Sequence, residues 1–466
     1  MEPTAFRIKQ HLDSIITYLT PLLPLANCHM VEFFTQNHWE SLLPSALRRQ
    51  LEEWDLNYAV DKFWSIAECG KYENNELSKW VHTARSHCLS VNNEYCLSRD
   101  QLQSRIEGWG GSIKPEIKVK DFMTGKKSYE VQTMSHLVAS LHEASRSTHC
   151  VEAGGGRGHL LVALSLGYGI PSLTVDCDDQ TLGNAVERVK IIQKQWHAIA
   201  KKIDNGVEAQ IVGANTCLHR FAATYVTPTT DFTKIVREKF PEHSGDVRVL
   251  LTGLHTCGDL GPDCLRIFST QDTTPALLTV PCCYHLLSED VDSASLSKVH
   301  GFPMSRHLKG YKLGRNARML ASQSIERVAA LRQMPADSLL YRALLQVIIK
   351  KHLPNYIPAE GKLKRVAPKC RNFEEYFKMA DAVLQLEIFD SLPDSYFTDI
   401  HEKMCDQRKK IFVFYLLRMC LAQVIESVIL LDRLLFLVET GFQNVHLVKL
   451  FDPVRSPRCH SIVAIR

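Results

Sequence analysis

The sequence lacks any uncharged apolar run long enough to cross a membrane. A membrane-spanning helix needs about 20 apolar residues in succession. The most apolar stretch, 411–437, contains Arg418, Glu426, Asp432 and Arg433, and charged side chains are costly inside lipid. We therefore expect no membrane span and predict a pair of buried helices in this stretch.

The cysteines lack the spacing that marks most zinc modules and redox motifs. The chain of 466 residues has 15 cysteines, yet Cys-x-x-Cys occurs nowhere. Residues 1–10 are polar and lack the apolar segment of a secretion signal. We expect free thiols in a reducing compartment, the cytoplasm or the nucleus. A net charge of only +4 neither marks nor excludes a nucleic-acid-binding protein.

A glycine-rich turn at 150–160 lacks the third glycine of a dinucleotide site. The pattern Gly-x-Gly-x-x-Gly requires glycine at 159, where this chain has His159. Its glycines are instead Gly154, Gly156 and Gly158, and Glu152 precedes them. A carboxylate disfavours a pyrophosphate at this position. It suits a cationic ligand, so we predict S-adenosylmethionine, which carries an ammonium and a sulfonium.

A second acid supports a nucleoside-containing ligand. The run 172–176 is typical of a strand and ends in Asp176, about 20 residues after the turn. Doubly wound folds place the carboxylate that binds ribose hydroxyls at this position. The alternative is that Asp176 caps the following helix, a role that Asp178 could equally take.

Alternating strands and helices predict an α/β fold with a doubly wound, mostly parallel sheet. Helices are expected at 129–144, 159–168, 180–203 and 261–268. After a first strand that ends in the glycine turn, strands are expected at 172–176, 207–212, 248–254 and 276–280. Two late strands, 445–450 and 461–466, suggest an antiparallel pair that finishes the sheet. The expected domains are a helical N-terminal region (1–112), the first part of the core (113–290), a helical insertion (291–410), and the last helices and strands (411–466).

Reactive side chains follow two neighbouring strands, where ligands of such sheets bind. His255 and Asp259 follow the fourth strand, and Cys282, Cys283, Tyr284 and His285 follow the fifth. In one interpretation they line a methyl-transfer pocket, with His255 or Asp259 accepting or orienting a proton and Tyr284 stacking on the acceptor. In a second interpretation, a zinc ion is bound by His255, Cys257, Cys282 or Cys283, and His285. In a third, the cysteines only pack. We expect packing and no metal site, because His-x-Cys and Cys-Cys lack the usual ligand spacing.

Cations are interleaved with glycines and a tyrosine over Arg306–Arg318. Such a run is usually a solvated surface, and it is also the best candidate in this chain for contact with an RNA backbone.

Several motifs together resemble the methyltransferase-like protein 25 family. They are the glycine turn and the segments 126–131, 253–260, 282–287, 314–318, 430–434 and 451–458. The resemblance implies an S-adenosylmethionine-dependent methyltransferase of the seven-strand doubly wound type. It implies contacts to the methionine part of the cofactor from Glu152, Gly154, Gly156 and Gly158, and to the ribose from Asp176. Lys126, Lys127, Glu130 and Leu254 are expected near the cofactor.

The chain departs from the family at the turn, where Glu-Ala-Gly-Gly-Gly-Arg-Gly replaces the commoner Asp-x-Gly-Ser-Gly-Lys/Gln-Gly. The Asn-Pro-Pro-aromatic motif of amino-methylating enzymes is absent after the fourth strand. The motifs at 253–258 and 282–285 are instead similar to those of a transfer-RNA 2′-O-methyltransferase family, which favours RNA as the methyl acceptor. The alternative is a protein that kept the fold but lost catalysis and serves as a binding or scaffold module.

Overall fold

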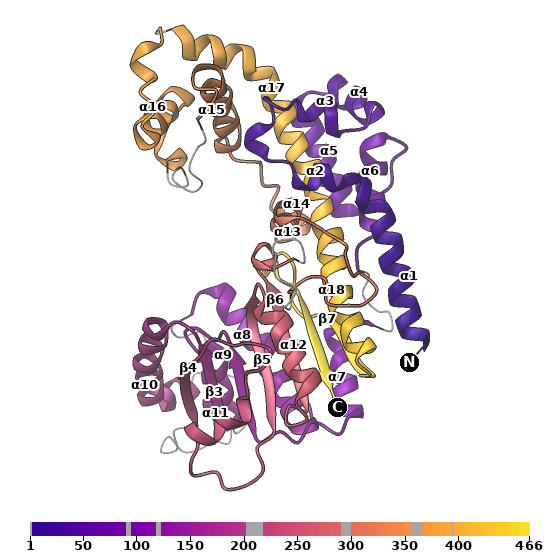
Figure 1. Cartoon of the computed structure of the whole chain (residues 1–466), viewed down its shortest axis with the longest axis vertical. Helices are drawn as coiled ribbons and strands as arrows, with labels where there is room; N and C mark the ends of the chain where they lie inside the picture. Colours follow the sequence, from indigo (N-terminus) through magenta and orange to yellow (C-terminus); the bar gives the residue numbers. More distant parts are fainter. Residues whose placement is uncertain are drawn as a thin grey trace. The chain divides into compact units, whose positions relative to one another are not determined.

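The computed structural model describes residues 2–89, 95–117, 123–201, 218–289, 300–356, 363, 366–393 and 395–466. The chain forms two compact units (Figure 1). The sheet unit contains residues 1–17, 88–322 and 425–466, and the helical unit contains residues 18–87 and 323–424. These bounds differ from the domains expected from the sequence, which remain predictions.

The sheet unit is built on one twisted sheet in the described part of the chain, with the strand order β1-β7-β8-β6-β5-β2-β3-β4. Every pairing is parallel except those of β8, which is antiparallel to both β6 and β7. The expected fold class, mostly parallel with an antiparallel finishing pair, is confirmed. The strands are β1 (Cys96–Ser98), β2 (His149–Ala153), β3 (Ser172–Asp176), β4 (His219–Ala223), β5 (Val249–Cys257), β6 (Ala276–Cys282), β7 (Asn444–Lys449) and β8 (His460–Ile465).

Two strands differ from the expectation. The strand expected at 207–212 lies outside the described residues, and β4 pairs with β3 at that side of the sheet. The sequence analysis missed β1, which has only three residues and pairs in parallel with β7. A strand of that length has no detectable periodicity, so only its partner reveals it.

Both faces of the central strands are buried, which explains their nearly continuous apolar sequences. On one face, Leu250 and Leu278 belong to a core cluster with Met134 of α8 and Leu160 of α9. Leu251 and Leu277 alternate with them along the strands and are equally buried, and α12 packs on β5 and β6. The helices of this unit include α7 (Arg99–Gly108), α8 (Gly125–Ala144), α9 (His159–Val162), α10 (Asp179–Lys201), α11 (Phe232–Lys239), α12 (Leu260–Thr270) and α13 (Arg315–Leu320).

The helical unit contains residues 411–424 of the most apolar stretch, and residues 425–437 of that stretch belong to the sheet unit. The helices of the helical unit include α2 (Leu23–Asn27), α3 (His38–Leu42), α4 (Ser45–Glu53), α5 (Leu56–Cys69), α6 (Glu76–Ser86), α14 (Ile325–Ala330), α15 (Ser338–His352), α16 (Phe373–Leu384) and α17 (Ser395–Met419). Two helices continue from one unit into the other along the chain, α1 (Glu2–Leu19) and α18 (Leu421–Glu439).

The charges of the 411–437 stretch have protein partners, as expected for buried helices. Arg418 donates to the carbonyl oxygens of Leu25 and Ala26 at 3.1 and 2.7 Å. Asp432 accepts from the backbone nitrogen and hydroxyl of Ser305 at 2.9 and 2.7 Å. Across the described residues, no helix is both long and apolar enough to cross a membrane.

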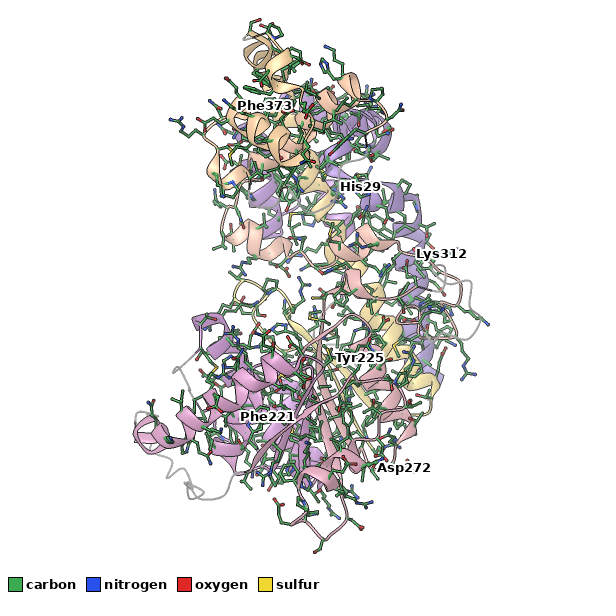
Figure 2. The ribbon with its side chains drawn as sticks, turned by 60° about the vertical axis from the view of Figure 1, so that its left-hand side comes forward. His29, Phe221, Tyr225, Asp272, Lys312 and Phe373 are labelled. Atoms are coloured by element: carbon green, nitrogen blue, oxygen red, sulfur yellow. The ribbon has the colours of Figure 1, made fainter. Side chains whose placement is uncertain are left out.

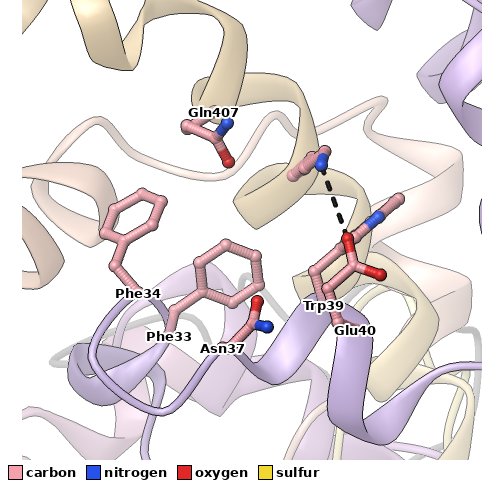
Figure 3. Close-up of a pocket in the computed structure, with 7 residues that line it drawn as sticks. Phe33, Phe34, Asn37, Trp39, Glu40 and Gln407 are labelled. Carbon is pink, nitrogen blue, oxygen red and sulfur yellow. Dashed lines mark ion pairs between the residues drawn. The ribbon is translucent and has the colours of Figure 1, made fainter.

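A pocket of about 390 Å³ lies in the helical unit (Figure 3). Its lining includes Phe33 and Trp39, and Lys410 pairs there with Glu40 at 3.8 Å. None of its lining residues belongs to the strand ends at which the sequence places the chemistry.

Because the central strands are buried, truncating one of their side chains should strongly lower the free energy of unfolding. We expect Leu278→Ala to lower the free energy of unfolding by about 2–5 kcal/mol, since Leu278 is fully buried and its truncation leaves a cavity. Urea denaturation followed by circular dichroism measures the change. Ile191→Ala on α10, where the side chain is 47% exposed, is the control and should cost about 0.5 kcal/mol or less. Equal losses in the two variants would contradict this assignment of the core.

Candidate functional site

The glycine turn follows β2 at the carboxyl edge of the sheet. Gly154, Gly156 and Gly158 all have left-handed backbone, with φ of +68°, +50° and +64°. Side chains disfavour this conformation, which explains the three glycines. A Cβ added at Gly156 would meet no heavy atom nearer than 3.9 Å. The turn therefore leaves open space beside bare main chain, next to the side chain of Asp176.

Glu152 is the last acid before the turn and is only 3% exposed. Its Oε2 is buried and has no hydrogen-bond partner among the described residues. Burial raises the pKa of Glu152 to about 7, against the lowering effects of the Lys127 charge and of backbone hydrogen bonds from Leu254 and Leu161. A buried carboxylate with an unused acceptor oxygen is unfavourable unless a donor or a cation satisfies it.

Asp176 lies at the end of β3 and helps to shape the turn. Its Oδ2 accepts from the backbone nitrogen of Gly156 at 2.9 Å, and its Oδ1 accepts from that of Asp178 at 3.1 Å. Asp178, in turn, accepts from Gln180 and Thr181 at the start of α10. The sequence left open whether Asp176 or Asp178 is the N-cap of α10, and the structure shows that Asp178 is. Each carboxylate oxygen of Asp176 retains acceptor capacity for a further hydrogen bond.

A buried carboxylate, Glu130 of α8, joins three distant parts of the sheet unit. Its Oε2 lies 3.1 Å from His255 Nε2, and its Oε1 accepts from the hydroxyl of Ser456 at 2.7 Å. Lys126 and Lys127, one turn earlier in α8, lie 3.5 and 3.9 Å from it. Burial opposes ionisation, but the hydrogen bond from His255, its charge and the Ser456 hydroxyl together lower the pKa of Glu130 to about 2. Glu130 is therefore a carboxylate at neutral pH.

His255 lies at an irregular point of β5. The pairing of β5 with β6 shifts register between Leu254 and Thr256, and His255 has φ of +79°. Such backbone is rare for a residue with a side chain and persists only where the surroundings enforce it. The shift leaves Leu254 buried beside the turn, and the His255 ring is directed at Glu130.

Two other candidates have mainly structural partners. Asp259 Oδ1 accepts from the backbone nitrogen of Ser288 at 2.8 Å, which ties the end of β5 to the segment after β6. Tyr284 is 1% exposed, and its hydroxyl donates to Glu426 at 2.8 Å. Burial and the charge of Glu426 hold the pKa of Tyr284 well above its ordinary value. Because the Tyr284 ring is buried and its hydroxyl is bonded to Glu426, we do not assign it the predicted stacking on a methyl acceptor.

Three thiols meet at the ends of β5 and β6. The Sγ of Cys257 lies 3.0 Å from that of Cys282 and 3.3 Å from that of Cys283. Cys282 is buried, Cys283 is half-buried and Cys257 is exposed. Hydrogen bonds from Cys282 and Cys257, with the charges of His285 and His255, outweigh burial and lower the pKa of Cys283 to about 5.

The tertiary structure adds residues that sequence reasoning missed. Ser456 belongs to the 451–458 motif, but nothing in that motif indicated a contact with Glu130, which forms only because the β7–β8 link returns to α8. Lys126, Lys127 and Glu130 were expected near the cofactor, but nothing in the sequence indicated that His255 pairs with Glu130. The zinc interpretation had grouped the strand-end cysteines, but only the structure shows that all three thiols of Cys257, Cys282 and Cys283 meet.

The turn fits S-adenosylmethionine on three observations. The unsatisfied Oε2 of Glu152 suits the ammonium of the methionine part. At Gly156 the main chain is uncovered, with no heavy atom nearer than 3.9 Å to an added Cβ. Asp176 lies next to the turn with acceptor capacity for ribose hydroxyls. The sequence-predicted residues Glu152, Gly154, Gly156, Gly158, Asp176, Leu254 and Lys127 thus lie around one edge of the sheet.

The raised pKa of Glu152 predicts a pH-dependent stability. Its folded-state pKa lies above its unfolded value, so its stabilising contribution is present at low pH and is lost as the pH rises through about 7. Glu152→Gln removes this titration. We expect its stability advantage over the wild type to be larger at pH 8 than at pH 5 by about 2–3 kcal/mol. Denaturation at both pH values measures it. Glu187→Gln, on the exposed face of α10, is the control and should track the wild type; a parallel pH profile for Glu152→Gln would exclude a raised pKa.

Comparison with known proteins agrees with this geometry. A family model described as a methyltransferase domain matches residues 126–290, from the start of α8 to just past β6. "Probable methyltransferase-like protein 25" of Mus musculus is 28% identical, with 98% of this chain and 96% of the relative covered. The Homo sapiens protein of the same name is 27% identical, with 98% and 97% covered. The resemblance seen in the motifs is confirmed: the chain carries a methyltransferase domain and is homologous over nearly its whole length to methyltransferase-like protein 25.

Proposed function

We propose that this protein transfers a methyl group from S-adenosylmethionine to an acceptor, with RNA as the favoured acceptor class. The observation that carries the cofactor assignment is the unsatisfied, buried Oε2 of Glu152 beside the open glycine turn. When bound, S-adenosylmethionine supplies an electrophilic methyl group on its sulfonium. Glu152 binds the ammonium, and Asp176 binds the ribose hydroxyls.

We propose His255 as the base that takes the acceptor's proton. Glu130 accepts a hydrogen bond from His255 Nε2 and fixes the ring orientation, which leaves Nδ1 for the acceptor. Because Glu130 is ionised, it also stabilises the imidazolium that forms. Asp259 is less suited to this task, since its Oδ1 already binds the backbone of Ser288. Cys282 is buried against two other thiols and is likewise a weaker candidate.

The cationic segment 306–318 supports an RNA acceptor. Arg306, Lys309, Lys312 and Arg315 are exposed, and Lys312 is labelled in Figure 2. Arg318 differs, because it is 2% exposed, lies 3.3 Å from Glu289 and donates to the carbonyl oxygen of Leu287. Arg318 thus attaches this segment to the chain just after β6. Arg306 also pairs with Glu439 at 3.8 Å, and we propose that the exposed Lys309 and Lys312 contact a phosphate backbone.

Cofactor binding can be tested at Asp176. We expect Asp176→Asn to weaken S-adenosylmethionine binding by about 10- to 100-fold, since it replaces charged hydrogen bonds to the ribose by neutral ones. Isothermal titration calorimetry measures the affinity. Asp272→Asn is the matched control, because Asp272 is 97% exposed and belongs to the turn before β6. Wild-type protein that shows no binding would overturn the proposed function.

The acceptor can be tested with a radiolabelled methyl group. We expect label from S-adenosylmethionine to enter fractionated total RNA rather than a protein extract. His255→Asn should lower the transfer rate by about 10²- to 10⁴-fold, as expected for loss of a general base, and should leave cofactor binding intact. Label in protein alone would overturn the RNA assignment. Cofactor binding without transfer to either fraction would favour the scaffold alternative.

A further inference from the structure

The thiols of Cys257, Cys282 and Cys283 form a compact triangle at the ends of β5 and β6. Its edges measure 3.0, 3.3 and 3.8 Å. Cys257 and Cys282 are register partners on neighbouring strands, so the sheet itself brings them together. Cys283 follows with left-handed backbone, φ +50°, which residues with side chains rarely adopt. That strained conformation places a third thiol beside the first two.

Neither simple packing nor a disulfide accounts for all three thiols. The thiol is a weak hydrogen-bond donor and acceptor, which gives little reason to enforce a strained backbone at Cys283. A disulfide between the closest pair, Cys257 and Cys282, would not explain why Cys283 lies beside them. A tetrahedral zinc ion with Zn–S bonds of about 2.3 Å places its sulfur ligands about 3.8 Å apart. The edge between Cys282 and Cys283 already has that length, and the other two edges are shorter, at 3.0 and 3.3 Å.

The three thiols alone form a compact ligand group, so a fourth ligand has to move toward them, and His285 of the same segment is the candidate. His285 is two residues after Cys283, and its Nδ1 is buried without a hydrogen-bond partner in the described parts of the chain. A buried ring nitrogen without a partner is unfavourable unless a ligand satisfies it. His255 is a poorer ligand because its Nε2 is already directed at Glu130.

We propose that Cys257, Cys282, Cys283 and His285 bind one zinc ion. Three thiolates and an imidazole form the closed ligand set of a structural site, so the ion cross-links the ends of β5 and β6 and activates no water. Each thiol that binds as a thiolate releases its proton to solvent. The cysteine spacing in the sequence lacks the usual signature because two strands, and not one loop, supply the ligands. The proposal is independent of methyl transfer.

The full-length protein provides the test. Protein purified under reducing conditions should contain about one equivalent of zinc, as measured by inductively coupled plasma mass spectrometry. After chelation, titration of the metal-free chain with Co²⁺ should give a tetrahedral visible spectrum and a sulfur-to-cobalt charge-transfer band of three-thiolate intensity. The Cys282→Ser and Cys283→Ser variants should each lose the intensity of one thiolate. His285→Gln should keep all three and weaken the binding.

Cys69→Ser is the matched control, since Cys69 is an exposed cysteine of α5 in the helical unit. It should bind the metal as the wild type does. Reduced wild-type protein that takes up neither zinc nor Co²⁺ would overturn the proposal. A cobalt spectrum of the wild-type protein without a sulfur charge-transfer band would also overturn the proposal. This measurement does not depend on the folding of any variant. Failure of cofactor binding in the calorimetric experiment would leave this site untouched, because no ligand of the proposed zinc ion belongs to the glycine turn.

Discussion

The hydrogen bonds of one buried carboxylate, Glu130, hold the proposed catalytic edge together. Glu130 belongs to α8, His255 to β5 and Ser456 to the link between β7 and β8. These segments are more than a hundred residues apart in the chain, and a charge this deeply buried is stable only with several partners. Its low pKa keeps the charge in place at neutral pH. The orientation of His255 therefore depends on the folding of nearly the whole sheet unit around one acid.

Glu152 shows the opposite use of a buried acid. Burial raises its pKa and leaves Oε2 without a partner, so the residue destabilises the free protein near neutral pH. A cationic ligand reverses that penalty, because it replaces the water that the carboxylate lost. Two carboxylates of the same edge thus have pKa values of about 2 and about 7. Glu130 is satisfied within the protein, whereas Oε2 of Glu152 has no hydrogen-bond partner among the described residues.

Strained backbone marks the same edge of the sheet. His255 and Cys283 both have positive φ; His255 lies within β5, and Cys283 follows the neighbouring strand β6. Backbone strain of this kind is stored where side-chain direction matters more than stability. At His255 the strain directs an imidazole to Glu130, and at Cys283 it brings a thiol to two others. The register shift between β5 and β6 lies at His255.

Local patterns in the sequence determined much of this protein. Apolar strands with helices between them identified the fold class, because burial on both faces requires such strands. The turn glycines and Asp176 could be located because strand, turn and helix are contiguous in the chain. The three-residue strand β1 could not be predicted in this way, because its hydrogen-bond partner β7 lies about 350 residues further along the chain.

The tertiary structure alone decided which side chains meet. Tyr284 resembled a pocket residue in the sequence but is buried against Glu426, and Arg318 resembled a surface cation but pairs with Glu289. Cys257 and Cys282 share no local motif, yet strand register makes them neighbours. The physical reason is that contacts across a sheet depend on strand order and register, which local spacing does not encode. The sequence determined the strands and the turn, and the pairing of those strands decided the chemistry at their ends.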